Sequence, residues 1–100
     1  MCSSDLKIVS KTGFVIYNDG YSNEGKSWSL TGSPKEEYRF RDYESAYDVE
    51  EHLKEKIEPQ AGMEWDSEFC QMWAYFPDKD SAVAYLKKIE DYFELAVKVL

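Results

Sequence analysis

Few side chains in this sequence could take part in catalysis: His52 is the only histidine, and Cys2 and Cys70 are the only cysteines. A catalytic histidine needs a nucleophile or an orienting acid in place, and no such motif surrounds His52. We therefore interpret His52 as an ordinary surface or boundary residue. Cys70 lies in an apolar run that predicts a strand, where a thiol is usually a small buried hydrophobe. The sequence predicts no catalytic residue.

Carboxylates offer a second kind of chemistry, because Glu64, Asp66 and Glu68 alternate as cation ligands on an extended loop could. The calcium-loop signature of spaced aspartates with a downstream glutamate is absent. Two cysteines and one histidine cannot complete a four-ligand zinc site without carboxylates. Glycine-rich phosphate loops and the nucleophile-elbow motif are also missing. We predict no metal and no cofactor, and a small enzyme without a recognisable motif stays as an alternative.

Acidic residues are concentrated in one stretch of the chain, from Asp42 to Glu68. Ten acids and two lysines give this stretch a net charge of −8, which equals the net charge of all 100 residues. A one-sided negative field attracts cationic partners and repels nucleic acid and anionic membranes. We therefore predict no direct binding to nucleic acid and no binding to membranes.

A helix is expected to position most of these acids, with Asp42 as its N-cap and Pro59 closing it. The apolar positions of one side recur at helical spacing and are expected to face the core: Ala46, Val49, Leu53 and Ile57. The acids of the opposite side form a row, spaced four, three, four and three residues apart: Glu44, Asp48, Glu51, Glu55 and Glu58. Like charges at this spacing destabilise a helix by about 0.2–0.5 kcal/mol per pair. The acidic row is thus mildly unfavourable for the fold, which favours a use outside it.

The remaining chain predicts an α+β fold in a single domain covering residues 1–100. The expected element order is ββββ-α-β-α, with an antiparallel sheet of four to five strands and both helices packed on one face. A loop of turn-forming residues is expected from Asn18 to Gly25. Strands are predicted from alternation and β-branched or aromatic content over residues 6–9, 14–17, 27–31, 38–41 and 69–76.

The C-terminal segment predicts the second helix, which starts after Pro77. Its apolar residues recur at helical spacing up to Leu100. Residues 95–100 also alternate, so an edge strand is an alternative there. We favour a helix because no turn residue separates this segment from the preceding helical pattern.

Aromatic side chains next to the acidic row are of the types that dominate binding energy in protein interfaces. The sequence therefore predicts a non-catalytic acidic protein that binds and inhibits a basic, nucleic-acid-binding protein, such as a nuclease or CRISPR effector, through residues 42–68. Inhibitors of the anti-CRISPR or anti-restriction type share this size and acidity. Besides the acidic row, the predicted partner-binding residues are Tyr43, Tyr47, Trp65, Glu64 and Asp66.

Other functions fit the same composition. A bacterial immunity protein or antitoxin would share the size and acidity, and a structural or oligomerising subunit, such as a homodimer, would use the acids only for solubility. A small-molecule binding module would line a cavity with Trp28, Trp73 and Phe76. The two cysteines lie far apart in the sequence and form no CxxC pair. This favours reduced thiols and a cytoplasmic location, in a bacterial host if the chain is phage-encoded.

Overall fold

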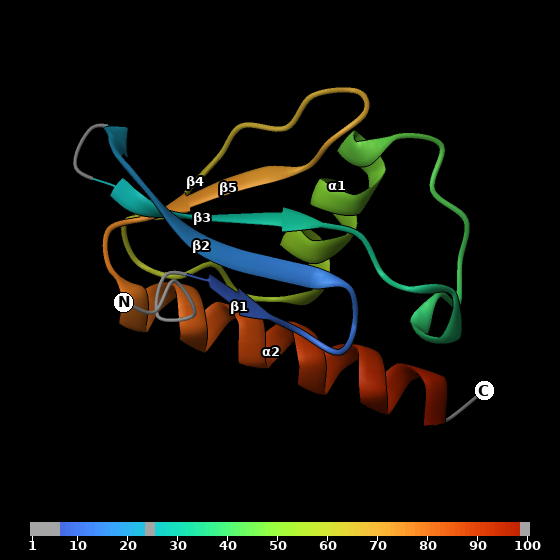
Figure 1. Ribbon diagram of the computed structural model, residues 1–100. Helices are drawn as coiled ribbons and strands as arrows, with labels where there is room; N and C mark the ends of the chain where they lie inside the picture. The colour runs from blue at the N-terminus through green and yellow to red at the C-terminus, as the bar shows by residue number, and fades with distance from the viewer. Residues whose placement is uncertain (1–6, 24–25, 99–100) are drawn as a thin grey trace.

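The computed structural model describes residues 7–23 and 26–98 and shows a five-stranded sheet with two helices (Figure 1). Every pairing in the sheet is antiparallel, and the strand order is β1-β2-β3-β5-β4. The predicted α+β class is confirmed. The elements are β1 (Lys7–Val9), β2 (Phe14–Asn23), β3 (Lys26–Gly32), the 3-10 helix η2 (Glu36–Tyr38), α1 (Ala46–Lys56), β4 (Glu64–Trp65), β5 (Trp73–Phe76) and α2 (Lys79–Lys98).

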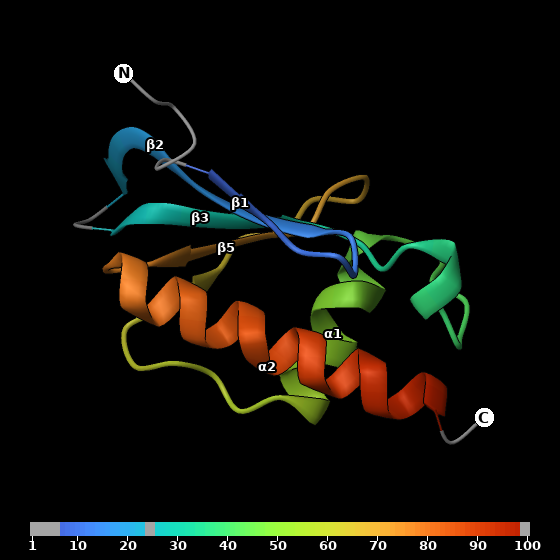
Figure 2. The same cartoon turned by 60° about the horizontal axis from the view of Figure 1, so that its bottom comes forward.

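Both helices lie on the same side of the sheet, as the sequence predicted (Figure 2). Strand alternation directs Ile16, Leu30 and Ala74 toward the helices, where all three are fully buried. Helix α1 contributes Val49 and Leu53 to this core, and Ile57, directly after the helix, contributes a third side chain. Helix α2 contributes five buried side chains at helical spacing: Ala82, Tyr85, Leu86, Ile89 and Phe93. The core is therefore a single layer between one sheet face and two amphipathic helices.

Helix α2 begins at a side-chain cap and extends almost to the end of the chain. The Asp78 carboxylate accepts a hydrogen bond from the Ser81 amide at 2.8 Å, which satisfies one of the free amides at the helix start. The helix then continues to Lys98, so the alternative of an edge strand after residue 95 is wrong up to that residue. Among the described residues, no helix is long and apolar enough to cross a membrane.

The predicted strand at residues 38–41 does not form. Glu36–Tyr38 is a 3-10 turn, and the residues after it are irregular. The segment is fixed instead by the Lys35 amide, which donates to the Thr12 carbonyl at 2.7 Å, and by Arg39, which donates to the Pro34 carbonyl at 3.2 Å. Gly13 permits this approach, because its φ of 114° suits glycine and a Cβ would collide with the Ser33 carbonyl.

The fifth strand comes from Glu64–Trp65, which the sequence analysis assigned to a loop. The element order is therefore βββ-α-ββ-α rather than ββββ-α-β-α. The two residues pair with Tyr75 and Ala74 of β5 and form one edge of the sheet. A strand this short has too few residues for an alternation pattern to appear.

Two further strand boundaries differ from the prediction. Strand β2 continues to Asn23 through the expected loop, with an irregular register between Asn18 and Asn23. Strand β5 begins at Trp73 rather than at residue 69, because reciprocal backbone hydrogen bonds between Glu68 and Gln71 close a turn there. Strand β5 is nevertheless an interior strand, between β3 and β4.

Candidate protein-binding surface

Helix α1 begins at Ala46, four residues after the predicted N-cap Asp42. Ser45 is the N-cap in extended conformation, and its side chain makes no capping hydrogen bond. The Ala46 amide donates to the Phe69 carbonyl at 2.9 Å, and the Glu44 amide donates to the Asp48 carboxylate at 2.8 Å. These bonds hold the preceding chain extended, so the helix starts later than its sequence pattern indicates.

The acidic row is therefore partly outside the helix. Asp48, Glu51 and Glu55 lie on α1, whereas Glu44 precedes it and Glu58 follows it. All five are exposed except Asp48, which is half-buried in the first turn, where a negative charge favours the helix dipole. Asp48 thus has a role within the fold, and the other four acids are directed to solvent.

Few cations neutralise these acids within the molecule. Glu50 pairs with Lys54 at 3.1 Å, Glu55 approaches Lys56 at 3.7 Å, and Glu64 approaches Lys26 at 3.5 Å. In the part of the chain that the structure describes, no lysine or arginine lies within ion-pair distance of Glu44, Glu51, Glu58 or Asp66. A large part of the negative charge of residues 42–68 is therefore available to a partner.

The inner side of α1 holds His52, which is only 4% exposed. The prediction of a surface or boundary histidine is wrong. Its Nδ1 lies 2.7 Å from the Tyr43 hydroxyl and its Nε2 lies 2.8 Å from the Tyr92 hydroxyl, so a neutral ring can donate to one tyrosine and accept from the other. The ring also packs edge-on against Phe40 and Phe93. His52 therefore links α1 to α2 and to the segment before α1.

Burial shifts the pKa values of His52 and of the tyrosines that contact it. It lowers the pKa of His52, and the positive charges of Arg41 and Lys56 lower it further. Burial also raises the pKa of Tyr43 to about 12. The histidine is thus held neutral between two protonated hydroxyls, which is the arrangement of a structural hydrogen-bonded group.

The three predicted aromatic anchors differ in how much they offer a partner. Tyr47 is 48% exposed. Tyr43 is half-buried, with its hydroxyl on His52 and the Arg41 guanidinium over its ring at 5.5 Å. Trp65 is half-buried and packs edge-on against Tyr85, with 5.9 Å between ring centres. Tyr47 is therefore the most accessible of the three.

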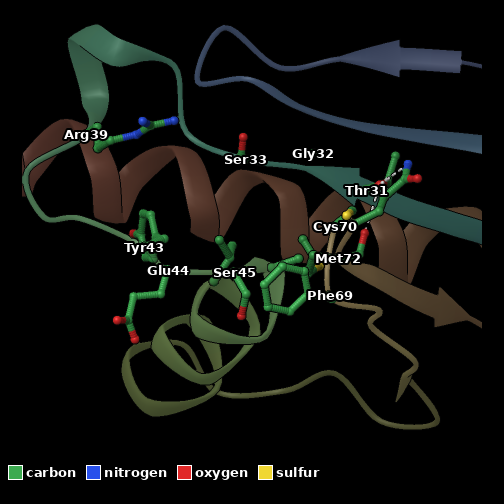
Figure 3. A pocket seen from close by; sticks show the side chains of 13 residues that line it. Thr31, Gly32, Ser33, Arg39, Tyr43, Glu44, Ser45, Phe69, Cys70 and Met72 are labelled. Carbon is green, nitrogen blue, oxygen red and sulfur yellow. Dashed lines mark hydrogen bonds between the residues drawn. The ribbon is translucent and has the colours of Figure 1, made fainter.

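A groove of about 610 Å³ opens at the N-terminal end of α1. It lies between the end of β3, the segment before α1 and the loop that precedes β5 (Figure 3). Glu44 of the acidic row lines it on one side, and Phe69 and Cys70 line it on another. The volume is in the range of ligand or side-chain pockets.

Phe69 is the residue of this surface that the sequence analysis missed. It is 65% exposed, although it begins an apolar run that predicted a buried strand. Cys70 is exposed as well, so the prediction of a buried thiol is wrong, while Cys2 lies outside the described residues. The turn at Glu68–Gln71 turns both side chains out of the sheet, and no local pattern indicates that turn.

The alternative of a small-molecule cavity lined by three aromatics is contradicted. Trp28 pairs with Phe76 and both are buried on the helix side, whereas Trp73 pairs with Thr31 three positions along the strands, which is an odd number. Because side chains alternate between faces along a strand, Trp73 lies on the opposite face of the sheet.

Comparison with known proteins adds no assignment to this geometry. The chain matches no protein-family model, no curated protein and no solved structure. Among the described residues, no three histidine, cysteine, aspartate or glutamate side chains are grouped so that they could hold a metal ion. The charge and exposure of this surface are therefore the features of the molecule that bear on its function.

Proposed function

We propose that this protein is a non-catalytic inhibitor that binds a basic, nucleic-acid-binding protein through residues 42–68. The expected target is a nuclease or CRISPR effector whose nucleic-acid groove carries lysine and arginine. The observation that carries the proposal is the set of exposed acids on and around α1 that have no cation partner among the described residues, Glu44, Glu51 and Glu58 in particular.

The mechanism is competition for the cationic groove. A helix advances 5.4 Å per turn, so Glu51 and Glu55 stand about one turn apart on α1, and Glu44 and Glu58 extend this line of negative charge before and after the helix. Such a line replaces the counterions of a basic groove as a phosphate backbone does, and the field also accelerates encounter. Acids that already pair with a cation within the molecule would contribute little to the free energy of binding.

Short-range contacts then fix the docked position. Tyr47 and Phe69 are exposed aromatics at the same end of α1, since the Phe69 carbonyl accepts from the Ala46 amide next to Tyr47. Aromatic side chains supply much of the binding energy in protein interfaces. The groove beside Phe69 offers space for an apolar or long basic side chain of the target.

The test begins with identification of the target. The purified protein is used as bait in lysate of the source cell, with washes at about 50 and about 300 mM salt, because added salt shortens the screening length. Each captured protein is then expressed, and its binding to labelled DNA or RNA is titrated with the inhibitor. We expect capture of one basic nucleic-acid enzyme that is lost at high salt and that releases its nucleic acid when the inhibitor binds.

A charge-reversal pair tests the surface. Glu51→Lys with Glu55→Lys should abolish capture and inhibition, while the control Glu36→Lys with Glu37→Lys makes the same charge change on η2 and should retain both. Equal loss in the two variants would show that only net charge matters. Unchanged inhibition by the Glu51/Glu55 variant would refute the proposal.

A further inference from the structure

The outer face of the sheet, opposite the helices, is a second candidate surface. Ile16, Leu30 and Ala74 point toward the helices, so the residues next to them along each strand point away. Both described helices lie on the other side, and neither covers this face (Figure 2).

One row of this face crosses all five strands. The register pairs Lys7 with Tyr17, Tyr17 with Ser29, Ser29 with Tyr75, and Tyr75 with Glu64. Directly paired residues project from the same face of a sheet. The row therefore reads cation, tyrosine, serine, tyrosine, anion from one edge to the other.

The neighbouring row is apolar over most of its length. Val9 pairs with Val15, Val15 with Thr31, and Thr31 with Trp73. Val9 is 66% exposed, and the Trp73 ring meets Tyr17 edge-on, with 6.2 Å between ring centres. The two rows together give an aromatic and aliphatic surface whose charges stand only at its edges.

We propose that this outer face binds a second copy of the chain, as a symmetric dimer with the two sheets stacked face to face. A two-fold axis parallel to the strands and passing over Ser29 exchanges the two edges of the row. It places Lys7 opposite Glu64 of the second copy, and Tyr17 opposite Tyr75. The row thus places opposite charges at both edges and a tyrosine opposite a tyrosine, which is the self-complementarity that a two-fold interface requires.

Three properties of the chain are compatible with this dimer. Ser29, at the centre of the row, is only 1% exposed in the single chain, so stacking the two sheets removes little further serine surface from water. The Glu64 side chain stays about half exposed despite its approach to Lys26 at 3.5 Å, so it can meet a second lysine. Helix α1 lies on the far side of each sheet, so the acids of α1 in the two copies face away from each other (Figure 2).

The experiment is sedimentation equilibrium of the purified protein from low to high micromolar concentration, with no target present. We expect a reversible monomer–dimer equilibrium. Lys7→Glu and Glu64→Lys should each weaken the dimer about threefold or more, because symmetry changes two ion pairs at once. The double variant restores opposite charges and should return the dissociation constant to that of the unmodified chain.

Matched variants separate this face from other surfaces. Trp73→Ala should weaken the dimer by about tenfold or more, with far-ultraviolet circular dichroism to show that the fold is kept. Lys87→Glu, an equal reversal at an exposed position on α2, should leave the dimer unchanged. A mass that stays monomeric at every concentration would overturn the proposal. A dimer whose dissociation constant is unchanged by Lys7→Glu and by Trp73→Ala would also overturn the proposal, because the two copies would then associate through another surface.

Glu64 belongs to both proposed surfaces, whereas Lys7→Glu and Trp73→Ala test the dimer without changing residues 42–68. A monomer can still inhibit a target through α1, and a dimer can form whether or not a target exists. Loss of the dimer with intact inhibition would refute only the stacked sheets. Loss of inhibition in the Glu51/Glu55 variant with an intact dimer would assign inhibition to α1 alone.

Discussion

The acidic side of α1 and the outer face of the sheet both lie away from the core between sheet and helices, but they suit different kinds of recognition. The acidic side carries exposed acids, of which Glu44, Glu51 and Glu58 have no cation partner among the described residues. The outer face carries tyrosines, valines and a tryptophan between one cation and one anion. Charge acts across several ångströms of water, whereas apolar contact acts only after water has left. A small protein can thus place long-range attraction and short-range fit on separate surfaces.

The largest expected effect concerns how α1 is held. Leu53 is fully buried on the inner side of the helix that presents the acids. Leu53→Ala should lower the free energy of unfolding by about 2–5 kcal/mol, because it removes buried methyl groups and leaves a cavity. Urea denaturation measures the change. A loss well under 1 kcal/mol would mean that the inner side does not anchor the helix.

Salt should separate the two surfaces. Raising the salt from about 50 to about 300 mM should lower the association rate with the target by about tenfold or more. The dissociation constant of the dimer should change by less than about threefold, because its ion pairs lie at the edges and contribute little. Stopped-flow kinetics and sedimentation give the two numbers. Equal salt dependence of both would remove the distinction between the surfaces.

Acid should weaken the attachment of α1 through one residue. Because burial lowers the pKa of His52, the unfolded chain takes up a proton first, at its ordinary pKa of about 6.5. The stabilisation is complete above that pH and declines as the pH falls toward the lower pKa of the folded state, by at most about 1.4 kcal/mol per pH unit. Urea denaturation from pH 7.5 to 5, at about half-unit steps, measures the slope.

His52→Gln provides the control, since His52 is the only histidine of the chain. The variant should be less stable at neutral pH and should lose the part of the slope that lies just below pH 6.5. An identical slope in both proteins would assign the pH dependence to carboxylates instead.

The smallest expected effect concerns the outer side of α1. Glu51→Lys with Glu55→Lys should change the free energy of unfolding by less than about 0.5 kcal/mol, because both side chains are exposed. The same denaturation assay checks it. A loss as large as that of Leu53→Ala would show that these acids serve the fold, and the variant could then no longer test binding.

The sequence predicted the elements whose pattern is long. The spacing of Val49, Leu53 and Ile57 identified the inner side of α1, and the apolar stripe from Ala82 to Phe93 identified α2. Alternation failed where tertiary contacts decide. Residues 38–41 alternate as a strand would, yet they form no strand. The hydrogen bonds from Lys35 to Thr12 and from Arg39 to Pro34 hold this part of the chain outside the sheet.

The surfaces were predictable only in part. The charge of residues 42–68 can be counted from the sequence, so the acidic row could be identified without knowledge of the fold. The exposure of Phe69 depends on a turn closed by Glu68 and Gln71, and the burial of His52 depends on Tyr92 of another helix. The outer row from Lys7 to Glu64 exists only through the register of five strands. Pairings between distant segments leave no local pattern to find.

The measurement that tests the central claim most directly is displacement of labelled nucleic acid from the captured target. Unmodified protein, the Glu51/Glu55 lysine variant and the Glu36/Glu37 lysine variant are titrated against the same complex in low salt. We predict displacement by the unmodified protein and by the Glu36/Glu37 variant, and none by the Glu51/Glu55 variant at the same concentrations. Full displacement by the Glu51/Glu55 variant would contradict the account, because the acidic side of α1 would then be only a solvated surface.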